Sequence, residues 1–204
     1  MEEVKILFLC KALKQYSKKY GMETHCTAGL RLNSDNEITD EWVRVYPIKA
    51  KAANNIKKWD IVRIEVDDWN PDPVRPESVR SIPTSLQPLN KLENERAKFE
   101  IIVKNLEKGD FLHEEEGWKG KSLGLIKPVR PRLYIEEDKI WCEFDCGSED
   151  CHLHKFQVWD DYFAKSWFEN PDEIRRYRDL YFLLGTIRKR PWIWSLISIF
   201  DLPI

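Results

Sequence analysis

The sequence predicts an α+β protein whose strands form a largely antiparallel sheet or a small β-barrel. Two observations support this prediction: the strand-like segments come in pairs joined by turn residues, and the helical patterns lie between blocks of strands. A doubly wound parallel sheet would instead need strands and helices to alternate. The 204 residues show no internal repeat, no low-complexity segment and no glycine-rich phosphate loop.

The N-terminal part has the pattern of a series of strands. A continuous apolar run at Val4–Cys10 predicts a buried strand, and strict alternation at Trp42–Tyr46 predicts a half-buried strand that Pro47 ends. Turn residues at Asn33–Asn36 join that strand to the one before it. The other strands predicted here are Thr24–Leu32, Asp60–Asp67 and a short edge strand within Glu77–Pro83.

The C-terminal part mixes helices with further strands. The clearest helix is predicted for Asn90–Lys108, where a capping box precedes apolar residues at helical spacing. A second amphipathic helix is predicted from Val158 to near Asn170, and Asn170 followed by Pro171 begins a third, short one. The strands predicted in this part are Ser122–Ile126, Leu133–Ile135, Lys139–Phe144, Asp179–Leu184 and Ile193–Phe200.

These elements favour a PUA-like or OB-like arrangement with peripheral helices and a Cys/His loop. We expect a β-rich N-terminal part (residues 1–85), a helix with an acidic connecting loop (86–121) and a β/α part (122–204). The first and last parts are expected to pack together as one compact unit.

Composition limits the class of function. A net charge of −2 excludes a broadly basic polyanion-binding protein, so any nucleic-acid surface must be a local patch. The N-terminal MEEVKILFLC lacks the basic region of a signal peptide, and the apolar stretch Trp192–Ile204 is too short to span a bilayer. We therefore expect a cytoplasmic protein with no membrane partner, whose five cysteines are thiols or metal ligands.

The stretch Trp141–Trp159 concentrates soft metal ligands with the spacing C-x3-C-x4-C-H-x-H. Thiolates and imidazoles suit tetrahedral zinc. The predicted ligands are Cys142, Cys146, Cys151 and His154, with His152 as an alternative to His154. If Cys142 is instead a core residue, a fourth ligand must come from elsewhere, and His25 and Cys26 are candidates. An incidental cysteine cluster is the alternative interpretation.

Three stretches interleave cations with aromatic residues. Lys and Arg neutralise phosphates, while exposed aromatic rings stack on bases. A solvated loop beside a Trp-rich core is the alternative interpretation. The predicted nucleic-acid contacts are Arg188, Lys189, Arg190 and Trp192 at a hairpin tip, and Arg175 and Arg176 on the short helix. The third stretch contains Lys127, Arg130, Arg132 and Tyr134.

Three functions fit these features. The first is nucleic-acid binding by a protein with a structural zinc site. The second is a barrel pocket for a modified base or nucleotide. The third is a metal-dependent hydrolase or nuclease with Asp160, Asp161 or Glu149 as base, although nucleases more often use oxygen ligands and Mg²⁺.

Blocks along nearly the whole chain resemble a little-studied prokaryotic protein family. The blocks are ETHCTAGL (23–30), WVRVYPI (42–48), KKWDIV (57–62), SLGLIKP (122–128), CGSEDCHLH (146–154) and DLYFLLGTIRKRPWIWSLISIFDLP (179–203). The chain departs from the pattern by inserting Met22 and by a looser acidic element at Trp159–Asp161. The resemblance implies a prokaryotic origin and a role in a defence or nucleic-acid-processing system, and it assigns no chemistry.

Overall fold

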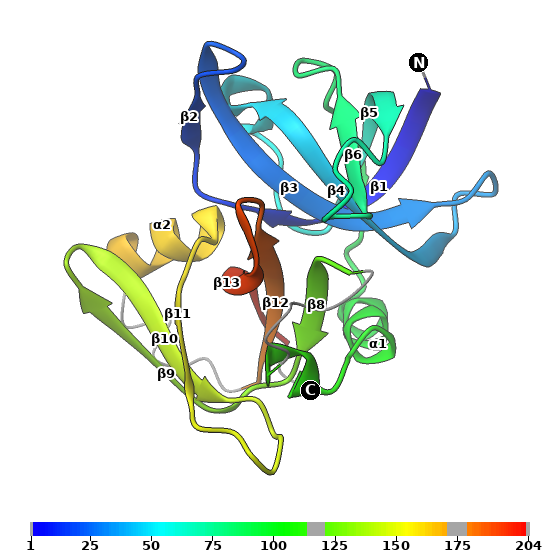
Figure 1. Cartoon of the computed structure of the whole chain (residues 1–204). Helices are drawn as coiled ribbons and strands as arrows, with labels where there is room; N and C mark the ends of the chain where they lie inside the picture. Colours follow the sequence, from blue (N-terminus) through cyan, green and yellow to red (C-terminus); the bar gives the residue numbers. More distant parts are fainter. Residues whose placement is uncertain (1, 114–120, 171–178, 203–204) are drawn as a thin grey trace. The chain divides into compact units, whose positions relative to one another are not determined.

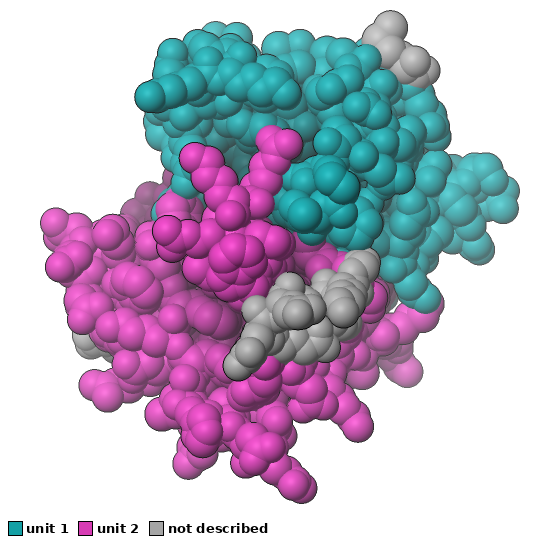
Figure 2. Space-filling model, viewed as in Figure 1, with its two compact units in different colours: residues 1–94 teal, residues 95–204 magenta. Residues whose placement is uncertain are grey.

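A computed structural model of the chain describes residues 2–113, 121–170 and 179–202. It divides into two compact units, Met1–Asn94 and Glu95–Ile204 (Figures 1 and 2). The short helix predicted after Asn170 falls on residues 171–178, outside the described residues. Among the helices that the structure describes, none has the length and apolar character needed to cross a membrane.

The first unit is a closed β-barrel. Strand β1 pairs antiparallel with both β3 and β5, β3 pairs antiparallel with β4, β4 pairs parallel with β6, and β6 returns antiparallel to β5. Figure 1 shows the long strands β3 and β4 curving together. The elements are β1 (Glu2–Lys11), β2 (Gln15–Ser17), β3 (Met22–Leu32), β4 (Ile38–Lys49), η1 (Ala50–Ala53), β5 (Asp60–Trp69), β6 (Ser78–Ser81) and β7 (Gln87–Lys91).

Alternation of apolar residues explains why these strands close on themselves. The inward side chains of β4 and β5 are small branched residues, including Val45, Val62 and Ile64, and each is fully buried. Strand β1 is almost continuously apolar and buried from Ile6 to Cys10, as its sequence predicts. Strand β4 continues past Pro47 to Lys49, so the prediction that Pro47 ends this strand is wrong. Its pairing with β3 extends as far as Lys49, opposite Thr24, and carries the strand past the proline.

The second unit contains two three-stranded sheets, β11-β10-β9 and β13-β12-β8. A parallel bridge between Val158 and Leu196 joins them at one side, and only Lys127 and Pro128 separate β8 from β9 at the other. The elements are α1 (Glu95–Lys104), η2 (Gly109–His113), β8 (Leu123–Ile126), β9 (Val129–Glu136), β10 (Lys139–Asp145), β11 (His154–Gln157), α2 (Asp161–Glu169), β12 (Leu180–Ile187) and β13 (Arg190–Asp201).

Both units share one strand order. In the first unit the order is β1-β3-β4-β6-β5, and β5 pairs with β1 again. In the second unit β8 and β9 are the two halves of a bent first strand, and the order is β9-β10-β11-β13-β12, with β12 pairing with β8. Numbered along the chain, both units have the order first, second, third, fifth, fourth. In each unit the third and fifth strands are parallel neighbours. This is the order of the five-stranded OB barrel. The predicted fold class, an α+β protein with an OB-like barrel, is therefore confirmed, and the shared order is present although the sequence shows no repeat.

The helices begin later than the sequence predicts. Helix α1 covers Glu95–Lys104, and the first residues of the predicted helix, Asn90 and Lys91, belong to β7, which pairs with β5. The backbone pairing offered by β5 overrides the local helical pattern there. Helix α2 covers Asp161–Glu169 rather than beginning at Val158, because Val158 is recruited into the bridge to Leu196.

Gly29 is the position where the first barrel leaves no room for a side chain. A Cβ atom at this residue would lie 2.1 Å from the carbonyl oxygen of Leu7 on the neighbouring strand β1. Because backbone atoms on both sides would have to move, we expect Gly29→Ala to lower the free energy of unfolding by at least about 2 kcal/mol, measured by urea denaturation.

Gly21→Ala is the matched control for that substitution. Gly21 has φ +63° but no atom within 4 Å of an added Cβ, so it carries only the cost of the left-handed backbone, about 1 kcal/mol. Equal losses of stability in the two variants would contradict the steric explanation.

Candidate metal centre

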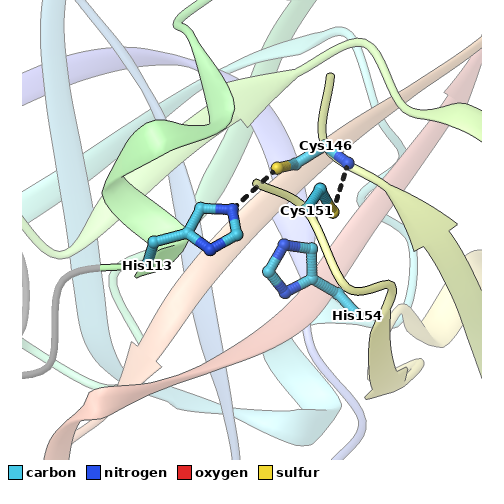
Figure 3. A group of neighbouring side chains, drawn as sticks. All are labelled: His113, Cys146, Cys151 and His154. Atoms are coloured by element: carbon cyan, nitrogen blue, oxygen red, sulfur yellow. Dashed lines mark hydrogen bonds between the residues drawn. The ribbon is translucent and has the colours of Figure 1, made fainter. Parts of the chain in front are cut away.

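Four side chains of the second unit converge on one point. The donor atoms of His113, Cys146, Cys151 and His154 all lie within 4.8 Å of one another. Figure 3 shows the two imidazole rings and the two cysteines gathered together, with Sγ of Cys146 facing the His113 ring. His113 ends η2, Cys146 and Cys151 belong to the loop between β10 and β11, and His154 begins β11. The group therefore joins η2, which precedes the strands of the second unit, to the loop between β10 and β11.

Two glycines allow this convergence. A Cβ at Gly109 would lie 2.5 Å from Cβ of Cys146 and 2.6 Å from its carbonyl oxygen, so only glycine lets η2 pack this closely against the loop. That packing carries His113 to a position where its Nε2 lies 3.2 Å from Sγ of Cys146. Gly147 has φ +83°, a conformation that glycine adopts at little cost, and it turns the loop directly after Cys146.

Burial disfavours the charged forms of two of the donors. Burial, followed by hydrogen bonding and charge from Cys151, raises the pKa of the Cys146 thiol to about 11. Burial and the neighbouring His113 lower the pKa of His154. The neutral imidazole is the form that binds a metal, whereas a thiol must lose its proton on binding. In addition, the backbone N–H of Cys146 donates to Sγ of Cys151 at 3.4 Å, an arrangement that stabilises a thiolate.

The donor set fits a tetrahedral metal ion. Bond lengths to zinc place the ligand atoms of a Cys2His2 site about 3.3–3.8 Å apart, so the group needs only a small contraction. His154 Nε2 is buried and has no hydrogen-bond partner among the described residues. A buried ring nitrogen without a partner is costly unless a ligand satisfies it, and a metal ion would do so. Two thiols and two imidazoles favour a soft or borderline cation such as zinc over Mg²⁺ or Ca²⁺.

The structure brings together three of the four predicted ligands. Cys142 is not among them: it points into the core of the barrel and is 0% exposed, and burial raises its pKa to about 12. The alternation of β10 places Ile140, Cys142 and Phe144 on the same inward face. His152 is also outside the group, while His25 and Cys26 lie on β3 in the other unit.

His113 replaces Cys142 as the fourth donor, and sequence reasoning missed it. It stands 33 residues before Cys146, so no local spacing links the two. The sequence offered one signal: the chain has only four histidines, so His113 was one of very few residues that could supply a further imidazole ligand.

Four of the six residues predicted to contact nucleic acid lie at the β12–β13 hairpin. Arg188 and Lys189 form its two-residue turn, and Arg190 begins β13. All three are exposed, and Trp192 is 53% exposed. Arg175 and Arg176 lie outside the described residues.

Asp160, a candidate base for the hydrolase alternative, caps helix α2. Its Oδ1 accepts hydrogen bonds from the backbone N–H groups of Tyr162 at 3.0 Å and Phe163 at 3.1 Å. Its Oδ2 accepts from the N–H of Ile199 on β13 at 2.8 Å, and its side chain is fully buried. These contacts describe a structural residue that ties α2 to β13.

Two barrels of OB strand order, the second with a Cys/His cluster, define an OB-fold protein with a candidate metal centre. The chain belongs to the family described as domain of unknown function DUF8758, whose model matches residues 2–105. The matched region contains the first barrel and α1, whereas the Cys/His cluster lies outside it. A comparison with curated proteins finds no match.

Several solved structures resemble the chain at low identity. One is a murine DNA-binding protein bound to double-stranded DNA, with 10% identity over 98% of this chain and 97% of that chain and a TM-score of 0.35. Another is a replication protein A heterotrimer bound to single-stranded DNA, with 7% identity over 90% and 43% of the two chains and a TM-score of 0.39. Because these TM-scores are low, the fold assignment rests on strand order alone.

The role of Asp160 can be tested by substitution. Asp160→Ala leaves three backbone donors without their acceptor, so we expect it to lower the free energy of unfolding by about 3 kcal/mol. Asp160→Asn keeps one acceptor oxygen and should cost roughly half as much. Urea denaturation measures both losses, with the exposed Asp150→Ala as control. An Asp160→Ala protein as stable as that control would contradict the structural role.

Proposed function

We propose that this protein binds nucleic acid through its second barrel and that a structural zinc ion holds that barrel together. The observation that supports binding most strongly is the exposed β12–β13 hairpin, with three consecutive cations at its tip and Trp192 beside them. Cations neutralise phosphates and an exposed indole can stack on a base.

The position of the hairpin supports the same proposal. Strands β12 and β13 are the fourth and fifth strands of the second barrel, and in OB barrels the loop between these strands commonly contacts oligonucleotides. The net charge of −2 means that this attraction is local. A local patch favours contact with a defined segment of a strand over broad binding to any polyanion.

The zinc part of the proposal rests on the donor set. Four protein donors fill a tetrahedral shell and leave no open position for a water nucleophile, which is the arrangement of structural zinc sites. His113, Cys146, Cys151 and His154 would hold the ion. Once bound, zinc would favour the thiolate form of both cysteines and fix η2 against the β10–β11 loop.

Metal analysis tests the zinc centre. We expect tag-free protein to carry about one zinc per chain by mass spectrometry of the metal content, because four soft donors already converge. His113→Ala and Cys151→Ser should each lose most of this zinc. Cys142→Ala, which removes a thiol outside the group, should retain it. A wild-type ratio near zero, or zinc loss in Cys142→Ala with retention in His113→Ala, would overturn the assignment.

Salt-dependent binding tests the hairpin. The variant R188A/K189A/R190A should bind labelled single-stranded oligo(dT) more weakly, and the slope of log K against log salt should flatten by about 2, since each lost phosphate contact removes about 0.7. Fluorescence anisotropy across a salt series measures both changes.

A matched variant controls for net charge. R96A/K104A/K108A removes three exposed cations of the same unit at and beyond α1, and it should leave the affinity and slope nearly unchanged. Equal losses in the two triple variants would show that only overall charge matters, and the proposed role of the hairpin would be rejected.

A further inference from the structure

We infer that the outward face of the sheet β9–β10–β11 is a stacking surface for the unpaired bases of a single-stranded nucleic acid, centred on Tyr134 and Trp141. The inference rests on the proposed function and deepens it by naming a second contact surface and the class of nucleic acid. The observation that prompts it is an aromatic pair on a barrel face that is otherwise polar and charged.

Strand register places the two rings side by side. Tyr134 on β9 is directly opposite Trp141 on β10, and Trp141 is opposite Gln157 on β11. Ile140 and Cys142, the residues on either side of Trp141 in β10, point into the core, so alternation directs Trp141 outward. Directly opposed side chains in an antiparallel sheet lie close enough to form one continuous surface.

A lysine lies over both rings. Nζ of Lys155 lies 5.4 Å from the ring centroid of Tyr134 and 5.0 Å from that of Trp141. The same Nζ pairs with Oε2 of Glu136 at 2.7 Å, and the hydrogen bond from this lysine to Glu136 is the main reason its pKa is raised. Both partners are about half exposed, and such ion pairs contribute little to stability, so a ligand can displace the lysine readily.

Two further contacts hold Tyr134 in place and add a cation beside its ring. The hydroxyl of Tyr134 donates to Oε1 of Glu143 at 2.9 Å, which fixes the orientation of its ring. The guanidinium of Arg132 lies 5.9 Å from the Tyr134 ring, at the edge of the aromatic pair. Nε1 of Trp141 is shielded from solvent and finds no acceptor among the described residues, so the indole presents its ring rather than its N–H group to a ligand.

These groups match the chemistry of a single strand. Unpaired bases present flat faces that stack on aromatic rings, whereas the bases of a duplex are already stacked on one another. When a strand binds, Lys155 leaves Glu136 for a phosphate, and the bases occupy the ring faces that the lysine covered. Arg132 supplies a second cation beside the same rings.

Strand β11 connects this face to the candidate metal centre. His154 and Lys155 are consecutive, so the first points inward to the Cys/His cluster and the second points outward over the rings. A metal ion bound by His154 would hold the beginning of β11 and thereby position Lys155.

Binding assays with full-length variants test the inference. Trp141→Ala should weaken oligo(dT) binding about tenfold or more without changing the salt slope, and Trp141→Phe should restore most of the affinity. Lys155→Ala should flatten the slope by about 0.7. The exposed Phe168→Ala, in the same unit, should leave binding unchanged. Wild-type protein should bind the single strand more tightly than the matching duplex.

A second variant avoids any loss of packing. Glu136→Gln removes the competitor for Lys155 at an exposed position, so it should tighten oligo(dT) binding a few-fold at low salt. If Trp141→Ala and Glu136→Gln both bind like wild type while R188A/K189A/R190A binds weakly, the stacking surface is wrong and the proposed function stands. If wild-type protein binds neither strand nor duplex, or binds an oligosaccharide or peptide there instead, both are wrong.

Discussion

The parallel contact between Val158–Asp160 and Leu196–Ile199 closes the second barrel, and the candidate sites depend on it. The N–H of Trp159 donates to the carbonyl of Leu196 at 2.7 Å, and Asp160 accepts from the N–H of Ile199. On one side of this contact is β11, with His154 of the Cys/His cluster and the outward Lys155. On the other is β13, which begins at the cationic hairpin tip. Closure therefore sets the cluster, the aromatic face and the hairpin on one rigid frame.

The Cys/His cluster adds a second constraint to that frame. Its donors come from η2, the β10–β11 loop and the first residue of β11, so a bound ion would tie these three segments together. Only glycine fits at position 109 against Cys146. Glycine loses more conformational entropy on folding than any other residue, so this close packing has an entropic cost. A metal ion bound there would stabilise the fold of this loop.

Alternation along β10 and β11 separates the two kinds of chemistry. Inward positions carry the core residues Cys142 and Phe144 and the cluster residue His154, while outward positions carry Trp141, Glu143 and Lys155. Cys142 and His154 thus lie on the inward side of the sheet, whereas the cation of Lys155 and the ring of Trp141 lie on its outward side.

The sequence by itself determined most of the longer strands and showed which residues carry soft donors and cations, but it did not predict the short strands β2, β7 and β11. Hydrophobic alternation is local, so it predicted β4 and β5, and the loop spacing predicted Cys146, Cys151 and His154. Only the tertiary structure decided the circular strand order, the recruitment of His113, the exclusion of Cys142, the start of α1 and the capping role of Asp160. Each of these depends on a partner far away in the chain: β5 for the residues before α1, Cys146 for His113, and β13 for Asp160. The spacing of residues along the chain does not reveal such contacts, because they form only when the strands of each barrel pair.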